Sequence, residues 1–214
     1  MNANLTEIVV VLDRSGSMAS MKEEAEGGLA TFVAEQKAQE GEARFTLAIF
    51  DDRYDVVHDR IDLQQAPERF ALEPRGMTAL LDAVGRTIAN VGHALSETPE
   101  AERPAAVLFC VVTDGGENSS REYAGDAVRR MVKEQTDKYS WQFTFLGAGP
   151  EVFAQGDRLG FNPAAGAAFT DVGMALGATS KKMSRMRRAA AGGADALAAA
   201  NVMTAEERAE AERR

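Results

Sequence analysis

The feature that most limits how this chain can fold is a pair of unbroken apolar runs. The first is Ile8–Leu12 and the second is Ala105–Thr113, and β-branched residues are frequent in both. Runs of this length without polar interruptions are typical of strands that are buried on both faces of a parallel sheet. Parallel strands need crossover connections, which are usually helices, so the two runs predict an α/β fold.

The rest of the chain alternates between helix and strand patterns. Apolar residues at helical spacing predict helices over 21–39 and from 79 to about 95. Further strands are expected at 45–50, 55–63, 141–147 and 164–170. The turn between the first two is too short for a crossover, so these strands should form an antiparallel hairpin at the sheet edge. We therefore expect an α/β/α fold with a mostly parallel six-stranded sheet and one antiparallel edge strand.

The end of the chain divides into a last helix and a tail. Asp171 is placed to cap a helix that ends near residue 191, where Gly192-Gly193 would break it. Residues 1–191 are therefore expected to form one domain. Residues 192–214 are rich in Ala and Glu and hold few large apolar side chains, which predicts a frayed helix or a disordered tail.

Local capping patterns predict where three helices begin. Thr78 stands at an N-cap position before the second helix. Ser119 with Glu122, and Thr204 with Glu207, have the spacing of a capping box.

Composition excludes several classes of function. The net charge of −9 argues against a protein that binds the phosphate backbone of nucleic acids. The single cysteine, Cys110, rules out an internal disulfide and is expected to be a buried thiol. Two histidines are too few for a His-rich zinc site. We find no signal peptide pattern and no apolar run as long as a membrane span, so we expect a cytoplasmic protein without membrane contact.

Candidate ligands for a metal ion follow the first apolar run directly. Asp13, Ser15 and Ser17 alternate along one short segment and offer hard oxygen atoms, which Mg²⁺ prefers. Ligands of open α/β sheets bind at this place, just past the carboxyl ends of strands. The segment is equally compatible with an Asx turn at Asp13 and a helix cap at Ser17.

Two further residues favour the metal site. Asp114 ends the second apolar run, and Thr78 stands at the head of a helix. The loops that carry Asp114 and Thr78 can both meet the Asp13 loop at the switch point of the sheet, where the connections from two neighbouring strands run in opposite directions. Two carboxylates and three hydroxyls would gather there, and a divalent cation would neutralise the repulsion between the carboxylates. Mg²⁺ commonly binds through few protein ligands and several waters, which leaves a position for an outside carboxylate.

These five residues resemble the metal-ion-dependent adhesion site of von Willebrand factor type A domains. Asp13-x-Ser15-x-Ser17, Thr78 within Gly-Met-Thr-Ala-Leu and Asp114 within Thr-Asp-Gly match the five motif positions in order. The resemblance covers about residues 5–190, and the small cytosolic chains of bacteria and phages are the most similar members.

This resemblance implies a Rossmann-like fold and a role for each motif residue. Ser15 and Ser17 would bind the metal directly through their hydroxyls, and Thr78 directly or through water. Asp13 and Asp114 would act largely through coordinated waters, or one of them directly. An Asp or Glu from a partner protein would complete the octahedron around Mg²⁺, with Mn²⁺ or Ca²⁺ as other possible ions. We therefore expect a monomeric protein-binding module and not an enzyme.

Other interpretations remain open on the sequence alone. The same Asp, Ser and Thr cluster could activate water in a metal-dependent hydrolase, although no His or Lys near the motifs suggests a general base. Asp51 and Asp52 are either ligands or, more in keeping with their position, turn residues. The basic cluster from Lys181 to Arg188 could bind nucleic acid or an acidic partner but is more typical of a solvated helix face.

Overall fold

The computed structural model describes residues 1–213 and confirms the predicted α/β fold. Six strands form one sheet in the order β3-β2-β1-β4-β5-β6, and only the β2–β3 pair is antiparallel. The strands are β1 (Asn2–Asp13), β2 (Glu42–Phe50), β3 (Tyr54–Asp62), β4 (Pro104–Thr113), β5 (Gln142–Ala148) and β6 (Ala167–Phe169). The expected hairpin thus lies at one edge, and the two unbroken apolar runs form the central strands β1 and β4.

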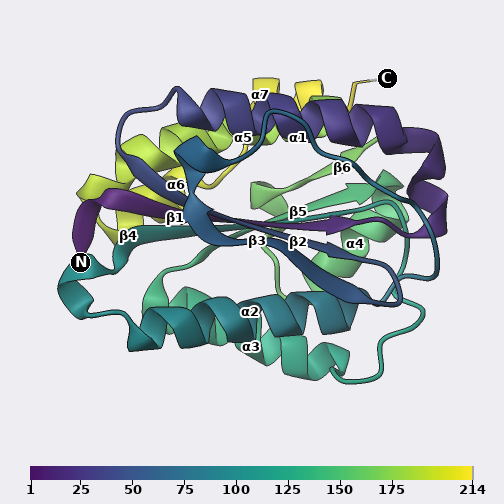
Figure 1. Cartoon of the computed structure of the whole chain (residues 1–214), viewed down its shortest axis with the longest axis horizontal. Helices are drawn as coiled ribbons and strands as arrows, with labels where there is room; N and C mark the ends of the chain where they lie inside the picture. The colour runs from purple at the N-terminus through teal and green to yellow at the C-terminus, as the bar shows by residue number, and fades with distance from the viewer. Residues whose placement is uncertain (214) are drawn as a thin grey trace.

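Helices cover both faces of the sheet (Figure 1). The helices α1 (Lys22–Lys37) and α5 (Val172–Ala189) lie on one face. The other face packs against α2 (Leu80–Glu97), α3 (Gly125–Tyr139) and α4 (Gly149–Arg158). Successive side chains of β1 point to opposite faces, so Val10 belongs to the first core and Val9 to the second. This arrangement explains why β1 has no polar alternation.

The sheet contains a switch point between β1 and β4. The chain leaves β1 through α1 towards β2 on one side, and leaves β4 through α3 towards β5 on the other. The loops after these two neighbouring strands therefore diverge, which opens a crevice at the carboxyl ends of the strands.

Two of the three predicted helix starts are wrong in detail. The N-cap residue of α2 is Ala79, one residue after Thr78. The pair Ser119 and Glu122 does not form a capping box, because α3 begins only at Gly125. The capping box of Thr204 and Glu207 is confirmed, as is the cap of α5 by Asp171.

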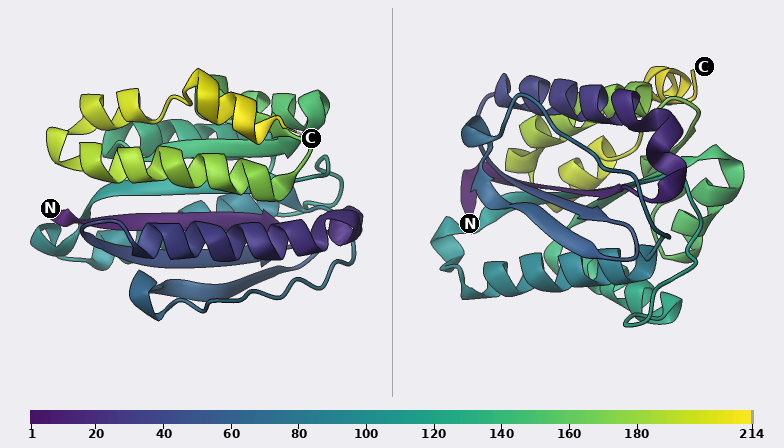
Figure 2. Two further views of the ribbon diagram at one scale, coloured as in Figure 1. Left: turned by 90° about the horizontal axis from the view of Figure 1, so that it is seen from above. Right: turned by 45° about the vertical axis from the view of Figure 1, so that its right-hand side comes forward.

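The segment after Gly193 differs from the expected frayed or disordered tail. It forms two short helices, α6 (Ala194–Ala200) and α7 (Ala205–Ala211), which lie alongside α5 (Figure 2). Leu197 and Met203 insert into the core that α1 and α5 share, so a few medium-sized apolar side chains suffice to dock the segment. That residues 1–191 form a domain by themselves stays a prediction.

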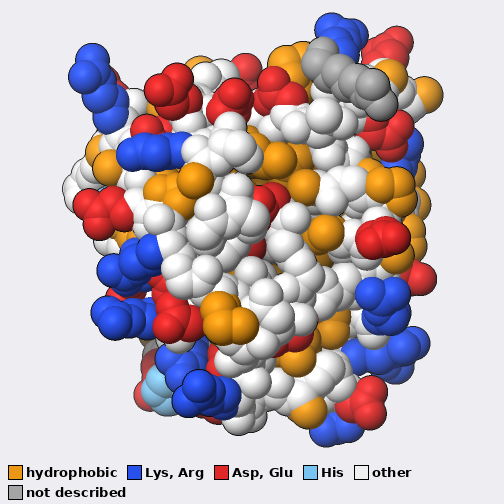
Figure 3. All heavy atoms as spheres, turned by 90° about the vertical axis from the view of Figure 1, so that its right-hand side faces the viewer, with side chains coloured by type: hydrophobic (Ala, Val, Ile, Leu, Met, Phe, Trp, Pro, Cys, Tyr) orange, Lys and Arg blue, Asp and Glu red, His pale blue; other side chains and the backbone are white. Residues whose placement is uncertain are grey.

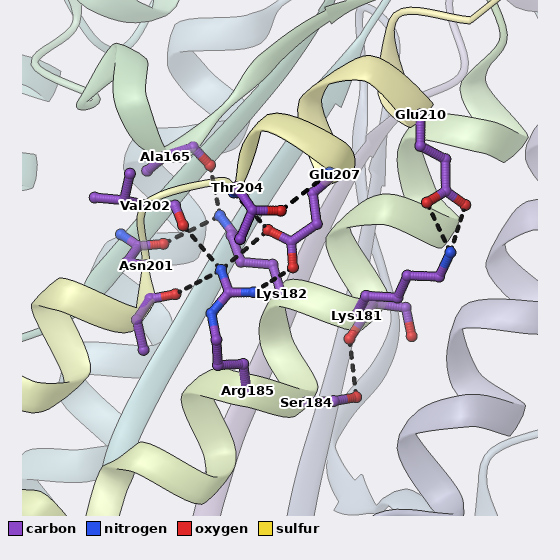
Figure 4. Close-up of polar contacts among 12 residues, drawn as sticks. Ala165, Lys181, Lys182, Ser184, Arg185, Asn201, Val202, Thr204, Glu207 and Glu210 are labelled. Atoms are coloured by element: carbon purple, nitrogen blue, oxygen red, sulfur yellow. Dashed lines mark hydrogen bonds and ion pairs between the residues drawn. The ribbon is translucent and has the colours of Figure 1, made fainter.

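The basic cluster of α5 is only partly a solvated face, because Lys181 and Arg188 are exposed but other cations of the cluster are buried. Lys182 is fully buried and donates hydrogen bonds to Thr144, to the carbonyl of Ala165 and to Asn201 (Figure 4). The guanidinium group of Arg185 pairs with Glu207 of α7. These cations therefore attach the C-terminal segment to the domain.

Other members of the cluster also have partners within the chain. Arg187 donates to the carbonyl of Gln36 in the last turn of α1 and to those of Glu40 and Gly41 in the turn after it. Cys110 is buried, as predicted. Among residues 1–213, no helix combines the length and the apolar character that crossing a membrane requires.

Candidate metal centre

The five predicted residues all lie at the carboxyl ends of the central strands. Asp13 is the last residue of β1, and Asp114 follows the last residue of β4 directly. Ser15 precedes a short 3-10 helix (Gly16–Met21) that contains Ser17. Thr78 stands two residues before α2. Three separate loops therefore bring these side chains to one edge of the sheet.

Three of the candidate ligands are joined by hydrogen bonds. The hydroxyl oxygens of Ser15 and Ser17 lie 3.1 Å apart. The Ser17 hydroxyl donates to Oδ1 of Asp114 at 2.9 Å, across 97 residues of sequence. The loop after β1 and the loop after β4 therefore meet in the structure.

Thr78 belongs to the same cluster through its contact with Gly115. A Cβ atom built on Gly115 would lie 3.1 Å from Oγ1 of Thr78 and 3.7 Å from Oγ of Ser17. The absence of a side chain at Gly115 thus lets both hydroxyls approach the end of β4.

Asp13 is the most deeply placed of the five. Its Oδ1 accepts the backbone N–H of Ser15 at 2.6 Å, and its Oδ2 accepts the Thr113 hydroxyl at 2.6 Å. Burial raises the pKa of Asp13 to about 6, although both hydrogen bonds act in the opposite direction and nearby Asp114 adds to the rise. Burial likewise raises the pKa of Asp114. Bringing the buried Asp13 and the half-buried Asp114 together as carboxylates without a cation is thus unfavourable.

The donor set fits a small divalent cation. Ligands at 2.0–2.1 Å in an octahedron have neighbouring oxygens about 2.9 Å apart. The separations of 3.1 Å and 2.9 Å along Ser15, Ser17 and Asp114 are compatible with such edges, and they are also ordinary hydrogen-bond lengths. Within residues 1–213 no group of three or more His, Cys, Asp or Glu side chains could hold a metal ion, so any cation here relies on hydroxyls beside two carboxylates.

A face poor in charge surrounds this edge of the sheet. Figure 3 shows a mostly uncharged centre with small acidic areas, while acidic and basic side chains both gather at the periphery. Ser17 is exposed and Asp114 is half-buried, whereas Asp13, Ser15 and Thr78 are buried. A molecule docking on this face would therefore reach the cluster through Ser17 and Asp114.

The residues that brace the Thr78 loop against the loop after β4 were not predicted from the sequence. The side chain of Asn118 accepts the N–H of Thr78 at 2.8 Å, and the N–H of Asn118 donates to the Thr78 carbonyl at 3.0 Å. Glu117 accepts the N–H of Leu81, and Asp82 accepts the N–H of Tyr123. A polar run after a strand end signals a loop, but its partners are 36 to 41 residues away and leave no local pattern.

Asp51 lies in the predicted turn, where its Oδ1 accepts the N–H of Arg53, and it does not join the hydroxyl cluster. It is fully buried, and its Oδ2 accepts the Nε atoms of Arg14 and Arg75. Burial by itself would raise the pKa of Asp51, but hydrogen bonds and the two guanidinium groups outweigh it and hold this pKa below its ordinary value.

Comparison with known proteins gives structural matches only. No protein-family model matches the sequence, and no curated protein matches it. Three solved structures illustrate the likeness. Proximal thread matrix protein 1 of the mussel byssus, with a zinc-occupied metal-ion-dependent adhesion site, has a TM-score of 0.55, is 13% identical and covers 94% of this chain and 47% of its own.

The other two matches come from a bacterium and a parasite. The von Willebrand factor type A protein from Catenulispora acidiphila has a TM-score of 0.51, is 18% identical and covers 87% of this chain and 43% of its own. The manganese-loaded TRAP protein of Plasmodium vivax has a TM-score of 0.51, is 14% identical and covers 74% of this chain and 63% of its own. This chain thus spans less than half the length of the first two proteins. At these identities the matches establish the architecture: the chain has a von Willebrand factor type A-like fold.

Proposed function

We propose that this chain is a metal-dependent binding module that recognises a carboxylate of a partner protein through a bound divalent cation. Asp13, Ser15, Ser17, Thr78 and Asp114 would hold the ion. The observation that carries the proposal is the convergence of Ser15, Ser17 and Asp114, whose oxygens are spaced like the edges of an octahedron.

The chemistry of the cluster supports Mg²⁺ as the resident ion, with Mn²⁺ and Ca²⁺ as alternatives. All the donors are hard oxygens, and five protein groups acting partly through waters leave room for an outside ligand. Two similar folds were solved with zinc or manganese, and zinc occupies the adhesion site in the mussel protein. A cation held by two carboxylates and neutral hydroxyls keeps little excess charge, so a partner carboxylate would bind mainly by completing the coordination shell.

We propose a binder and not an enzyme. Hydrolysis at such a metal needs a group that accepts a proton from water. The two histidines, His58 and His93, lie on β3 and α2, away from the residues that form the cluster. The acidic surface and the uncharged centre of the strand-end face suit a protein partner better than nucleic acid. We further propose that the chain acts as a monomer in the cytoplasm.

Calorimetric titration with Mn²⁺ and Mg²⁺ tests the site. Wild type is expected to bind one ion, and Asp13→Ala and Ser15→Ala are expected to lose binding while keeping the wild-type circular dichroism spectrum. Ser20→Ala is the matched control, because Ser20 is an exposed serine on the same 3-10 helix. Equal binding by wild type and Asp13→Ala would refute the assignment.

A second experiment separates binder from enzyme. Generic phosphate and ester substrates are offered to the Mn²⁺-loaded protein, and the proposal expects no turnover above that of Asp114→Ala. Turnover that disappears in Asp114→Ala would instead establish a hydrolase.

A further inference from the structure

Asp51 makes several connections near the candidate site without belonging to it. Asp51 follows β2, the neighbour of β1, and Phe50 pairs with Asp13 in the register of these strands. The N–H of Arg14 donates to the Phe50 carbonyl at 2.7 Å. Asp51 therefore lies beside the segment that carries Asp13, Ser15 and Ser17.

The carboxylate of Asp51 ties three loops together. Its Oδ2 accepts Nε of Arg14 at 2.9 Å and Nε of Arg75 at 2.8 Å. Its Oδ1 accepts the N–H of Arg53 in its own turn at 2.6 Å. Its backbone carbonyl accepts the N–H of Ala79 at 2.9 Å. Both carboxylate oxygens are thus occupied, so Asp51 supports the loops instead of binding an ion.

The tethered residues are direct neighbours of the candidate ligands. Arg14 stands between Asp13 and Ser15, and Ala79 follows Thr78. The same two loops are joined a second time, since the N–H of Arg75 donates to the Arg14 carbonyl at 2.9 Å. Displacing Asp51 would therefore move candidate ligands on both loops.

The positive charges of Arg14 and Arg75 give a second way in which Asp51 would affect cation binding. The Arg14 side chain is 8% exposed and follows the first candidate ligand, so its positive charge would oppose a cation nearby. Asp51 pairs with its Nε and Asp55 with its Nη2. These two carboxylates neutralise Arg14 and Arg75 next to the place where the ion would bind.

We propose that Asp51 is a positioning residue of the cation site, which fixes the Asp13–Ser17 and Thr78 loops through Arg14, Arg75 and Ala79 and cancels the charge of the two arginines. This inference rests on the proposed function, because it concerns how the same site is held. Residues that orient metal ligands commonly change affinity by about 10- to 100-fold when they are replaced.

The test measures Mn²⁺ affinity by calorimetry for wild type, Asp51→Asn, Asp55→Asn and Asp52→Asn, well below their melting temperatures. Asp51→Asn keeps the shape of the side chain but weakens its pairing with both arginines, and we expect a dissociation constant about 10- to 100-fold higher. Asp55→Asn, at a side chain that is 54% exposed, removes only the second partner of Arg14 and should weaken binding several-fold. Asp52→Asn removes an exposed charge from the same turn and should stay within about twofold of wild type.

The outcomes separate this inference from the proposed function. If wild type binds Mn²⁺ and Asp51→Asn folds and binds it with equal affinity, the positioning role of Asp51 is overturned and the proposed function is not. If Asp51→Asn does not fold, Asp55→Asn decides, and a loss no larger than that of Asp52→Asn would overturn the role. Wild type that binds no ion would refute the proposed function itself.

Discussion

The hydroxyl of Thr113 donates a hydrogen bond of 2.6 Å to Oδ2 of Asp13, and so links the ends of the two central strands across the switch point. The other oxygen of Asp13 accepts the N–H of Ser15. Asp13 is thus held by two donors that both favour its ionised form. The orientation of the first candidate ligand depends on the neighbouring strand.

Thr113→Val should therefore weaken cation binding without removing any proposed ligand. The substitution keeps the shape of the side chain but deletes the donor, so the pKa of Asp13 rises further above its ordinary value. We expect Mn²⁺ affinity to fall about 10- to 100-fold in a calorimetric titration. Thr6→Val, at a buried position nearer the start of β1, is the matched control and should bind Mn²⁺ as wild type does. Unchanged affinity in Thr113→Val would contradict this view of Asp13.

Alanine substitutions at two adjacent glycines after β4 should have very different effects on Mn²⁺ affinity. Gly115→Ala would place a methyl group 3.1 Å from the Thr78 hydroxyl and crowd Ser17, so we expect Mn²⁺ affinity to fall roughly tenfold. At Gly116 the nearest atom to a new Cβ is Oε1 of Gln155 at 3.9 Å, so Gly116→Ala should bind as wild type does. Similar affinities for the two variants would argue that Thr78 and Ser17 do not share an ion.

A second glycine pair tests the packing of α1 on α5. A Cβ atom on Gly28 would lie 2.7 Å from Cα of Gly173, so Gly28→Ala must push the helices apart and should cost about 1–3 kcal/mol of unfolding free energy. At Gly27, no heavy atom of the described chain lies within 4 Å of such a Cβ, outside its chain neighbours and its own helix backbone. Gly27→Ala should therefore stabilise the protein by up to about 1 kcal/mol. Urea unfolding measures the change in unfolding free energy for both variants. Changes of the same sign would contradict the close contact between α1 and α5.

The buried amine of Lys182 should make stability depend on pH. Burial lowers its pKa from 10.5 to about 7, so between these values the unfolded chain binds more protons than the native protein. Above about pH 7 the unfolding free energy therefore rises with pH, by at most about 1.4 kcal/mol per pH unit. Below that pH the free-energy cost of burying the Lys182 amine is constant. Lys182→Met should lose this slope in urea unfolding between pH 7 and 9. Lys181→Met, at the exposed neighbour, should keep this slope. A slope that survives in Lys182→Met would refute the lowered pKa of Lys182.

The central strands could be predicted from the sequence because they are local patterns, and the five candidate ligands were named from their motif; that they bind a metal stays a prediction. Ile8–Leu12 and Ala105–Thr113 are apolar throughout, and a polar residue at each strand end marks the edge where ligands gather. Parallel pairing then brings Asp13 and Asp114 to the same edge. The structure adds the distances, which no spacing in the sequence contains.

The features that were missed depend on partners far away in the chain. Asp51 has the sequence context of a turn, and only Arg14 and Arg75 reveal its role, 37 and 24 residues away. Lys182 was expected on a solvated face because it stands among other cations. Its burial depends on acceptors from β5 and from the segment after α5, among them Asn201. Isolated propensities do not encode such tertiary contacts.

The most direct test of the central claim is the position of a paramagnetic ion in solution. Mn²⁺ added at low stoichiometry to ¹⁵N-labelled protein broadens the signals of amides close to it. The account predicts selective broadening at residues 13–18, 76–79 and 113–116, and its loss in Asp114→Ala with an otherwise unchanged spectrum. Broadening centred elsewhere on the acidic surface, or the same broadening in Asp114→Ala, would contradict the proposed cation site.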